Sequence, residues 1–528
     1  MSIRDTIARN TGFNAAGRLW EALVALVLTR YIVDAVGVPA FGVWALVSVF
    51  TGYVALADFG VGSAYVKYVA EHAARRETSE ISAVVTTGTA FYFVLGAVVV
   101  TVGWPCVNAI VALFEWFGMA GEQASADLRF LLRGGLLLFA ATNLTAAFTA
   151  IQTGLQRMGV TTVISFASSI AKIAATIAFL EMGFGVRGLL YASAISLAVF
   201  ALSSIVAAFR LVPGLRLGPT AFQTSTLRRL VHFGIRAQVA KLSNLVLFQT
   251  DLVVAGLVRG AFGYTGLYQL GVALANKMRQ LPVILLSALV PAASDMDARD
   301  DHERLERLYL VASKYVAALA IPLALYTAGC AGPLIRAWMG DRLGLEVSVG
   351  VLRIIAVGYI ANIIPGAGVS VALGKGLPGL QMRAGLIATV SNIVLTVGLV
   401  LTIGFWGIPL GTAISLYVSW AWFARAMRGV LGVSHRRFLR VAVVWPVLAS
   451  LPGLVVSVLC DAASAHTAAF APNLAAAAAG LAAFAISYLA IIRVMPFLDE
   501  WDLDFLENTL KLAHVPGFRI WSRGFRHV

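Results

Sequence analysis

Long apolar runs recur from one end of this chain to the other, and they limit what it can fold into. Runs of about 20 residues with almost no charge are long enough to cross the hydrocarbon core of a bilayer as helices. Of the 528 residues, 59% are hydrophobic and only 12% are charged, too few charges for the surface of a water-soluble protein of this size. The short alternating segments of a membrane β-barrel do not recur. The sequence therefore predicts an all-α polytopic membrane protein.

The order of the apolar runs predicts how the chain is organised. Their lengths correspond to about fourteen transmembrane helices joined by short loops. We expect an N-terminal six-helix lobe, a basic cytoplasmic linker, a C-terminal six-helix lobe, two extra helices and an amphipathic cytoplasmic tail. In chain order these units are residues 1–210, 211–229, 230–430, 431–495 and 496–528.

A weak internal repeat supports the two lobes. Residues 42–46 read GVWAL and residues 266–270 read GLYQL, and each pentamer opens a helix after a short turn. Parallel repeats of this kind occur in transporters, where an axis along the membrane normal relates the two halves. We therefore expect the two six-helix lobes to be pseudo-symmetric.

The net charge of +14 is better explained by membrane topology than by a nucleic-acid partner, and none is expected. Arginines gather in alternate loops, as they do in the cytoplasmic loops of membrane proteins. The loop at 105–127, on the other side, contains acids and no arginine. Both termini are therefore expected in the cytoplasm. From Pro496 onward, apolar residues at helical spacing predict a helix lying on the inner membrane face, with a solvated tail as the alternative.

The stretch from Thr29 to Glu80 carries the most specific pattern in the chain. After Arg30 it reads VGVP at residues 36–39, then FGVWAL at 41–46, and ADFGVGSAYVKYVAEH at 57–72. The pattern resembles the polysaccharide transporter branch of the multidrug/oligosaccharidyl-lipid/polysaccharide (MOP) exporter superfamily, the Wzx-type lipid-linked oligosaccharide flippases. Members of that family have an LGP-like turn, then FGxWAL, then LxDLGxGxAxVRYVAE. The resemblance covers nearly the whole chain, with mild departures in the turn and in the last segment.

The resemblance implies a function, a membrane and partners. The substrate would be an undecaprenyl-diphosphate-linked oligosaccharide, a repeat unit of O-antigen in lipopolysaccharide, of capsule or of exopolysaccharide. Two lobes would rock in alternating access and carry the head group from the inner to the outer leaflet of the bacterial cytoplasmic (inner) membrane. The lipid tail would stay in the bilayer. A polysaccharide polymerase and glycosyltransferases are the protein partners that such a flippase implies.

Polar side chains inside the predicted helices are candidates for the substrate site, because charges in a membrane helix usually face a cavity or one another. Two helices carry such residues at helical spacing, so that each set shares one face. The first and the fifth predicted helices hold these sets, which are Asn14, Arg18 and Glu21, and Ser165, Ser169, Lys172 and Thr176. Arg and Lys suit the oxygens of a diphosphate, with which they form charge-assisted hydrogen bonds. The two sets predict a cationic cavity that binds an anionic substrate.

The seventh predicted helix adds Lys241 and Asn244 to the candidate cavity and also carries Asp251. Asp58, in the second predicted helix, is the other intramembrane carboxylate of interest. For Asp58 and Asp251 two interpretations remain open. Each could bind a coupling ion, H⁺ or Na⁺, or could form a structural pair, for instance with Lys241. For Arg18 and Lys172 the cavity is favoured, while pairing of Arg18 with Glu21 is the structural alternative.

The sequence disfavours catalysis, a cofactor and a metal site. No nucleotide-binding glycine motif, paired-histidine motif or metal-spaced cysteine set occurs. A membrane-embedded glycosyltransferase or polymerase would need a sizeable outer loop, which the chain lacks. Among transporters, a peptidoglycan-precursor (lipid II) flippase remains an alternative. A cation-coupled multidrug exporter of the same superfamily is another, although its cavity would favour acids and aromatic residues over Arg18 and Lys172.

Overall fold

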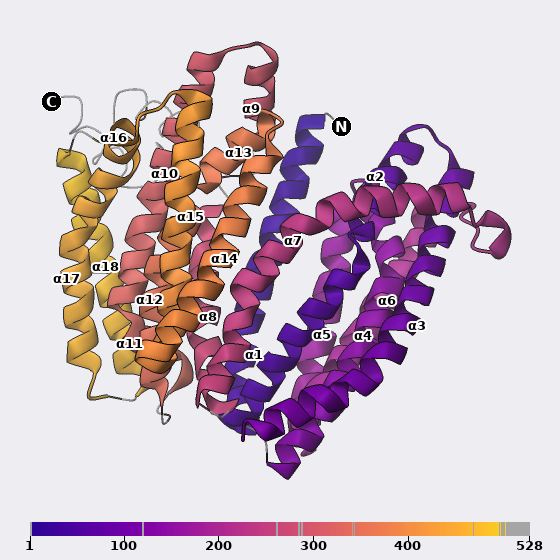
Figure 1. Ribbon diagram of the computed structural model, residues 1–528, viewed down its shortest axis with the longest axis horizontal. Coiled ribbons are helices and arrows are strands. Elements are labelled where there is room, and N and C mark those ends of the chain that lie inside the picture. The colour runs from indigo at the N-terminus through magenta and orange to yellow at the C-terminus, as the bar shows by residue number, and fades with distance from the viewer. Residues whose placement is uncertain are drawn as a thin grey trace. The chain divides into compact units, whose positions relative to one another are not determined.

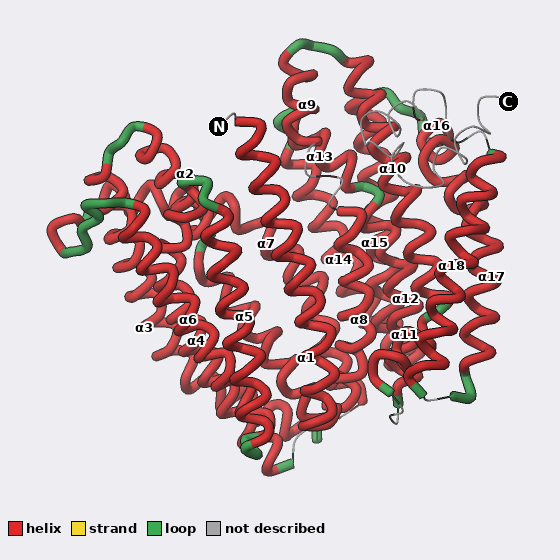
Figure 2. The backbone as a smooth tube through the Cα atoms, turned by 180° about the vertical axis from the view of Figure 1, so that it is seen from behind, coloured by secondary structure: helices red, strands yellow, loops and turns green. Residues whose placement is uncertain are grey.

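A computed structural model gives the fold of the chain. It describes residues 3–118, 121–259, 262–283, 286, 289–340, 342, 344–467, 469–495, 497 and 502. Within these residues the backbone forms helices joined by short loops, and it contains no strand (Figure 2). The chain divides into two compact units, Met1–Gln269 and Leu270–Val528. The first unit runs past the predicted linker because α7 packs against α1, α2 and α3, so the six-helix lobes stay a prediction.

The first unit contains the helices up to the start of α8, and their order follows the chain (Figure 1). They are α1 (Ile3–Val54), η1 (Ala55–Asp58), α2 (Val61–Ala74), α3 (Thr78–Trp116), α4 (Glu122–Gly154), α5 (Met158–Glu181), α6 (Gly185–Leu211), η2 (Pro219–Ala221), α7 (Thr224–Arg259) and α8 (Phe262–Val283). The second unit contains the remainder of α8 and all later helices. They are α9 (Leu289–Ala298), α10 (His302–Gly329), α11 (Ala331–Met339), α12 (Leu345–Ile363), α13 (Gly366–Gly374), α14 (Pro378–Ile403), η4 (Gly404–Trp406), α15 (Gly407–Leu431), α16 (His435–Phe438), η5 (Leu439–Val444), α17 (Trp445–Ser464) and α18 (Phe470–Val494).

The predicted class, an all-α polytopic membrane protein, is confirmed. Among the described residues, 10 helical stretches are long and apolar enough to cross a membrane. One of these stretches, Pro378–Leu431, contains both α14 and α15. Another, Leu23–Val54, contains a kink at Gly37, whose backbone is not helical (φ 79°, ψ 163°). This kink is the turn expected from the VGVP sequence. The expected count of about fourteen helices is not confirmed by these stretches.

The second predicted helix is interrupted at its carboxylate. The helix that passes Trp44 ends at Val54, a 3-10 turn covers Ala55–Asp58, and α2 begins at Val61. Gly60, between the two, has φ +70°, and a Cβ on it would lie 2.2 Å from the carbonyl oxygen of Gly234 in α7. Only glycine combines this left-handed backbone with such a close approach. Broken helices in transporters are usually found where the backbone borders a substrate or ion pathway.

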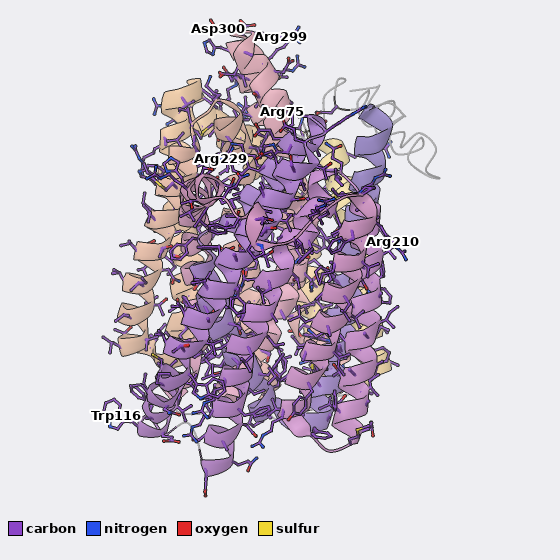
Figure 3. All side chains as sticks on the ribbon, turned by 90° about the vertical axis from the view of Figure 1, so that its right-hand side faces the viewer. Arg75, Trp116, Arg210, Arg229, Arg299 and Asp300 are labelled. Carbon is purple, nitrogen blue, oxygen red and sulfur yellow. The ribbon has the colours of Figure 1, made fainter. Side chains whose placement is uncertain are left out.

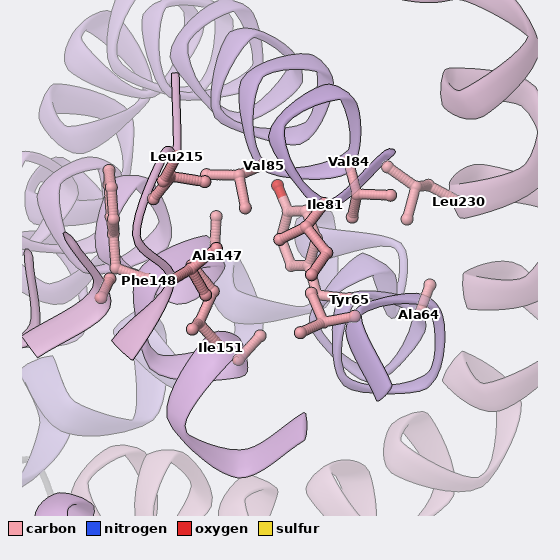
Figure 4. Close-up of a cluster of buried hydrophobic side chains, with 14 of the residues drawn as sticks. Ala64, Tyr65, Ile81, Val84, Val85, Ala147, Phe148, Ile151, Leu215 and Leu230 are labelled. Atoms are coloured by element: carbon pink, nitrogen blue, oxygen red, sulfur yellow. The ribbon is translucent and has the colours of Figure 1, made fainter. Parts of the chain in front are cut away.

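The interrupted segment is held by a buried core in the first unit. Tyr65 of α2 is fully buried, and its ring lies among side chains of α3 and α4 (Figure 4). Leu230 of α7 packs against the same cluster. The ring centroids of Tyr65 and of Tyr92 in α3 are 5.7 Å apart. Because α2 is anchored on several sides, the break at Asp58 is a fixed feature of the fold.

The two repeat pentamers meet through their glycines. A Cβ added to Gly42 would lie 1.9 Å from the carbonyl oxygen of Phe262 and 3.0 Å from the amide nitrogen of Gly266. A Cβ on Gly266 would in turn lie 2.5 Å from the carbonyl oxygen of Val38. The first turns of α8 therefore touch the backbone of α1 directly.

We expect Gly42→Ala to destabilise the protein by about 1–3 kcal/mol or more, because the new methyl group cannot be accommodated without moving the backbone. The matched control is Gly398→Ala in α14, where nothing lies within 4 Å of the added Cβ. That change should be neutral or slightly stabilising, since alanine favours helix. Equilibrium unfolding of the purified variants in mixed micelles measures the difference. Equal stability of the two variants would contradict the close packing.

A cluster of charges joins the last two helices, α17 and α18, to other helices of the second unit. Asp461 of α17 accepts a hydrogen bond from Arg336 of α11 at 3.0 Å and also pairs with Arg353 of α12. Arg336 donates through Nε to Asn473 of α18 at 3.2 Å. The guanidinium of Arg353 therefore has a carboxylate partner. The cluster connects α17 and α18 to α11 and α12.

Candidate functional site

A polar cavity opens between three helices of the first unit. Helix α1 packs beside α5 and α6, and α5 packs beside α6 (Figure 1). The cavity between them has a volume of about 480 Å³, within the ~300–1,000 Å³ typical of small-molecule sites. Its polar lining comes from all three helices, and those residues are Glu21, Ser165, Ser168, Ser169, Lys172, Ser193 and Ser196.

Lys172 stands at the junction of this cavity with a second one. The second cavity has a volume of about 180 Å³ and shares Ala25, Leu28 and Lys172 with the first. Its remaining wall includes the aromatic side chains of Phe41 and Trp44 as well as Thr176. A serine-rich chamber and an aromatic chamber thus share Lys172 in their lining.

The expected polar face of α5 is present and lines the cavities. Ser165, Ser169, Lys172 and Thr176 border one cavity or the other, and the outer two lie roughly 16 Å apart along the helix axis. Lys172 is nine residues before the end of α5 at Glu181, so its Cα is roughly 13 Å inside that end. Among the described residues, Lys172 has no ion pair and no hydrogen-bond partner. A lysine at this depth is costly unless an anionic group visits it.

Three of the cavity serines donate their hydroxyl protons to backbone carbonyl oxygens. Ser168 donates to the carbonyl oxygen of Ser165 at 3.0 Å, and Ser196 donates to that of Ser168 at 2.9 Å. Ser193 donates to the carbonyl oxygen of Leu189 at 2.8 Å. With their protons used in this way, these hydroxyl oxygens are left as acceptors for a ligand. The chamber can therefore accept hydrogen bonds from sugar hydroxyls, while Lys172 supplies the positive charge.

Glu21 makes the cavity less purely cationic than the sequence suggests. Its side chain is exposed and lines the same chamber as Lys172. The two do not form an ion pair among the described residues. A carboxylate in this position accepts hydrogen bonds only, and sugar hydroxyls can supply them.

For four of the predicted cavity residues, the structure describes the backbone and not the side chain. Asn14 and Arg18 belong to the backbone of α1, and Lys241 and Asn244 belong to that of α7. Their side chains lie outside the described part of the chain. The roles expected for these four residues, and the pairings of Arg18 with Glu21 and of Lys241 with Asp251, stay predictions.

The two carboxylates considered for ion coupling both have structural hydrogen bonds. Asp58 accepts a hydrogen bond from the backbone N–H of Gly60 at 2.5 Å, which ties the carboxylate to the interrupted helix. Asp251 is 3% exposed and accepts from the hydroxyl of Tyr268 in α8 at 2.8 Å. The neighbouring Thr250 shares a hydrogen bond of 2.6 Å with Tyr53 of α1. These contacts agree with structural roles, and a coupling-ion role for either aspartate stays a prediction.

Comparison with known sequences decides the family. The sequence profile of the family described as "Polysaccharide biosynthesis protein" matches residues 7–297, more than half of the chain. The chain belongs to the polysaccharide biosynthesis protein family. A curated relative, the uncharacterized membrane protein EpsK of Bacillus subtilis (strain 168), is 25% identical over 361 residues, which cover 66% of this chain and 68% of EpsK.

Solved structures of transporters and flippases, one of them described as a member of the MOP superfamily, share the fold of this family member. The lipid II flippase MurJ, in an inward closed conformation, matches with a TM-score of 0.66 and 16% identity, over 91% of this chain and 98% of MurJ. An inward-facing multidrug resistance MATE family transporter matches with a TM-score of 0.62 and 19% identity, over 78% of this chain and 99% of the transporter. At these identities the likeness concerns the fold.

Sequence reasoning missed the contribution of α6 to the polysaccharide biosynthesis protein's cavity. Ser193, Ser196 and Phe200 all line it and are spaced i, i+3 and i+7, so they share one helix face. That pattern was readable, but it carries no charge and serines are common in apolar helices. Trp44, in the family-like stretch, was read as part of a motif and also lines the second cavity.

The side chains that commonly bind metals do not gather in the described part of the chain. No group of three or more His, Cys, Asp or Glu side chains there could hold a metal ion.

Proposed function

We propose that this protein is a flippase that carries a polyprenyl-diphosphate-linked oligosaccharide from the inner to the outer leaflet of the bacterial inner membrane. The observation that supports this most strongly is Lys172, a lysine deep in a membrane helix, facing a hydroxyl-lined cavity without an ion-pair partner among the described residues. Its ammonium group would bind the diphosphate by charge-assisted hydrogen bonds where little water screens the charge.

The lining of the cavities suits an oligosaccharide attached to that diphosphate. Serine oxygens and the carboxylate of Glu21 accept hydrogen bonds from sugar hydroxyls. The indole of Trp44 in the adjoining chamber offers an apolar face with one polar edge, which suits a ring that is apolar on its faces and polar at its rim. The substrate class would therefore be an O-antigen, capsule or exopolysaccharide repeat unit, as the family resemblance implies.

The charges at the two ends of the first unit support an orientation in which its arginine-bearing end faces the cytoplasm, as the sequence predicts. Arg75, Arg210 and Arg229 lie toward one end of this unit, whereas Trp116 lies near the opposite end (Figure 3). Arginines mark the cytoplasmic side of a membrane protein, and tryptophan is enriched at the interfaces. A substrate assembled in the cytoplasm would then enter the cavity beside Glu21 and Ser165, before reaching Lys172.

Transport would proceed by alternating access, in which the head group crosses through the polar cavity and the lipid tail stays in the bilayer. Asp58, at the break in its helix, and Asp251 would either bind a coupling ion, H⁺ or Na⁺, or form structural pairs that hold the helices. Glycosyltransferases would supply the substrate and a polymerase would consume it.

A lipid II flippase is the second candidate, because MurJ shares the fold and lipid II also carries a polyprenyl diphosphate. A multidrug exporter of cationic compounds is disfavoured, because Lys172 would repel them.

The proposal is tested by genetic replacement in a strain that lacks its own oligosaccharide flippase. We expect the full chain to restore surface polysaccharide. In the strain without this chain, the lipid-linked oligosaccharide should stay in the inner leaflet. A parallel replacement in a strain depleted of its lipid II flippase separates the two candidates. Rescue of peptidoglycan synthesis without rescue of surface polysaccharide would overturn the proposal in favour of lipid II.

A further inference from the structure

A second groove lies in the other unit, far along the chain from the proposed substrate cavity. It has a volume of about 420 Å³ and is bordered by the C-terminal half of α15, by α16 and by the start of η5. Apolar and aromatic side chains form its walls, and two basic residues lie among them. Its lining includes Tyr417, Trp420, Ala421, Arg425, His435 and Phe438.

The walls of this groove are held in place by contacts outside it. Tyr417 donates a hydrogen bond to the carbonyl oxygen of Val357 in α12 at 3.1 Å. Phe438 is 5% exposed and stacks on Tyr309 of α10, with ring centroids 5.3 Å apart and an interplanar angle of 19°. The two walls are therefore anchored to different helices, so the groove is a built feature of the second unit.

The residues of α15 change character along one face. Tyr417, Trp420, Ala421 and Arg425 all border the groove, and their spacing of three, four and eight residues from Tyr417 keeps them on one side of the helix. The face runs from aromatic rings, over small alanines, to a guanidinium near the helix end at Leu431. An amphiphilic molecule with an apolar chain and a polar head matches this order.

The polar end of the groove is rich in arginine. No Asp or Glu occurs between Glu346 and Asp461, while this part of the chain contains a run of arginines near the groove. Arg437 pairs with Glu306. Within the described residues, the other arginines of the run have no ion-pair partner, and these are Arg425, Arg428, Arg436 and Arg440.

We propose that this groove binds an anionic phospholipid of the bilayer, with its phosphate at Arg425 and His435 and an acyl chain between Trp420 and Phe438. Leu439, which lines the groove, and Val418 are exposed apolar side chains on helical stretches long and apolar enough to cross a membrane. Basic pockets at the ends of membrane helices bind anionic headgroups, and each nearby arginine adds to the attraction. The occupant is a resident membrane lipid, distinct from the transported substrate.

Native mass spectrometry of the full chain, released from micelles that contain phosphatidylglycerol or phosphatidylcholine with the same acyl chains, tests this site. We expect phosphatidylglycerol, and not phosphatidylcholine, to remain bound. The double variant Arg425→Gln, His435→Gln should bind phosphatidylglycerol at least about tenfold more weakly than the wild type. Ala421→Trp should lose a similar amount, because the indole fills the groove while every charge remains. Arg383→Gln, an exposed arginine of α14 away from the groove, should bind as the wild type does.

Three results would overturn the site. Unchanged phosphatidylglycerol binding in the double variant would show that Arg425 and His435 do not bind the phosphate. Unchanged binding in Ala421→Trp would mean that lipids gather at the surface charge and do not enter the groove. Displacement of phosphatidylglycerol by an equimolar amount of undecaprenyl phosphate would assign the groove to the carrier lipid instead. Gel filtration of each variant, with a monodisperse peak required, ensures that lost binding reflects the groove and not unfolding.

Discussion

Replacing Lys172 with glutamine is expected to stop transport while leaving the protein folded. Glutamine is somewhat shorter than lysine, but it keeps the side chain polar and removes its charge. A hydrogen bond to a charged group contributes about 1.5–3 kcal/mol, so loss of the ammonium group should weaken diphosphate binding by roughly 10- to 150-fold. Lys172 has no ion-pair partner among the described residues, so its neutralisation leaves no carboxylate there unpaired. Restoration of surface polysaccharide in a flippase-deficient strain measures the effect, with membrane abundance checked alongside.

Two further variants make this result specific. Lys172→Arg should keep part of the function, because the phosphates need positive charge and not a transferable proton. Lys67→Gln removes an exposed lysine of α2 and should leave transport unchanged. Full activity of Lys172→Gln would remove the cationic cavity from the mechanism. Loss of the variant from the membrane would indicate that Lys172 has a structural role.

The second large effect concerns a buried ion pair that attaches the tail to the second unit. Lys314 of α10 is 8% exposed and pairs with Asp502, which is 1% exposed. Asp502 also accepts a hydrogen bond from the hydroxyl of Tyr315 at 2.6 Å, and the ammonium of Lys314 lies 4.9 Å from the ring centroid of Phe497. We expect Lys314→Met to cost about 3–5 kcal/mol of unfolding free energy, because it leaves a buried carboxylate without its partner.

A combined replacement separates the cost of the unpaired charge from the value of the pair. Lys314→Met together with Asp502→Leu and Tyr315→Phe should recover most of the lost stability, since apolar groups of similar volume can replace a buried pair. Lys375 pairs with Asp297, and these side chains are 13% and 33% exposed, so Lys375→Met should cost clearly less. Equilibrium unfolding in mixed micelles compares the variants. Equal costs for Lys314→Met and Lys375→Met would contradict the role of burial.

The burial of Phe497 and Asp502 bears on the tail. The sequence predicted an amphipathic helix on the membrane surface from Pro496 onward, with Phe497 on its apolar face. Phe497 and Asp502 are buried at 5% and 1% exposure, so both pack against protein. The remaining tail residues lie outside the described part of the chain, and the helix itself stays a prediction.

Local patterns in the sequence predicted much of what the structure contains. The helical class followed from apolar run length, and the kink at Gly37 followed from the VGVP sequence. The polar face of α5 followed from spacing alone, because residues at i, i+4, i+7 and i+11 must share one side of a helix. These features depend on neighbours in the chain, which a single sequence displays directly.

Features that depend on distant packing were not predicted. The apolar run around Asp58 predicts a continuous helix, whereas the structure has an interruption there. The run does not reveal that Gly60 must approach Gly234 of α7. Asp461 received no role, although its contacts with Arg336 and Arg353 connect three helices. The serines of α6 joined the cavity only once α5 and α6 were placed side by side. Each case needs the partner helix, which no local pattern supplies.

The central claim is that the protein flips a lipid-linked sugar by recognising its diphosphate, and reconstitution tests it most directly. Proteoliposomes would contain one fluorescent oligosaccharide on either a polyprenyl diphosphate or a neutral diacylglycerol, and a membrane-impermeant quencher would report which molecules reach the outer leaflet. We predict rapid exposure of the diphosphate-linked sugar by the wild type, at least about tenfold slower exposure by Lys172→Gln, and background exposure of the neutral lipid. Equal exposure of both lipids by wild type and Lys172→Gln would contradict diphosphate recognition at this cavity.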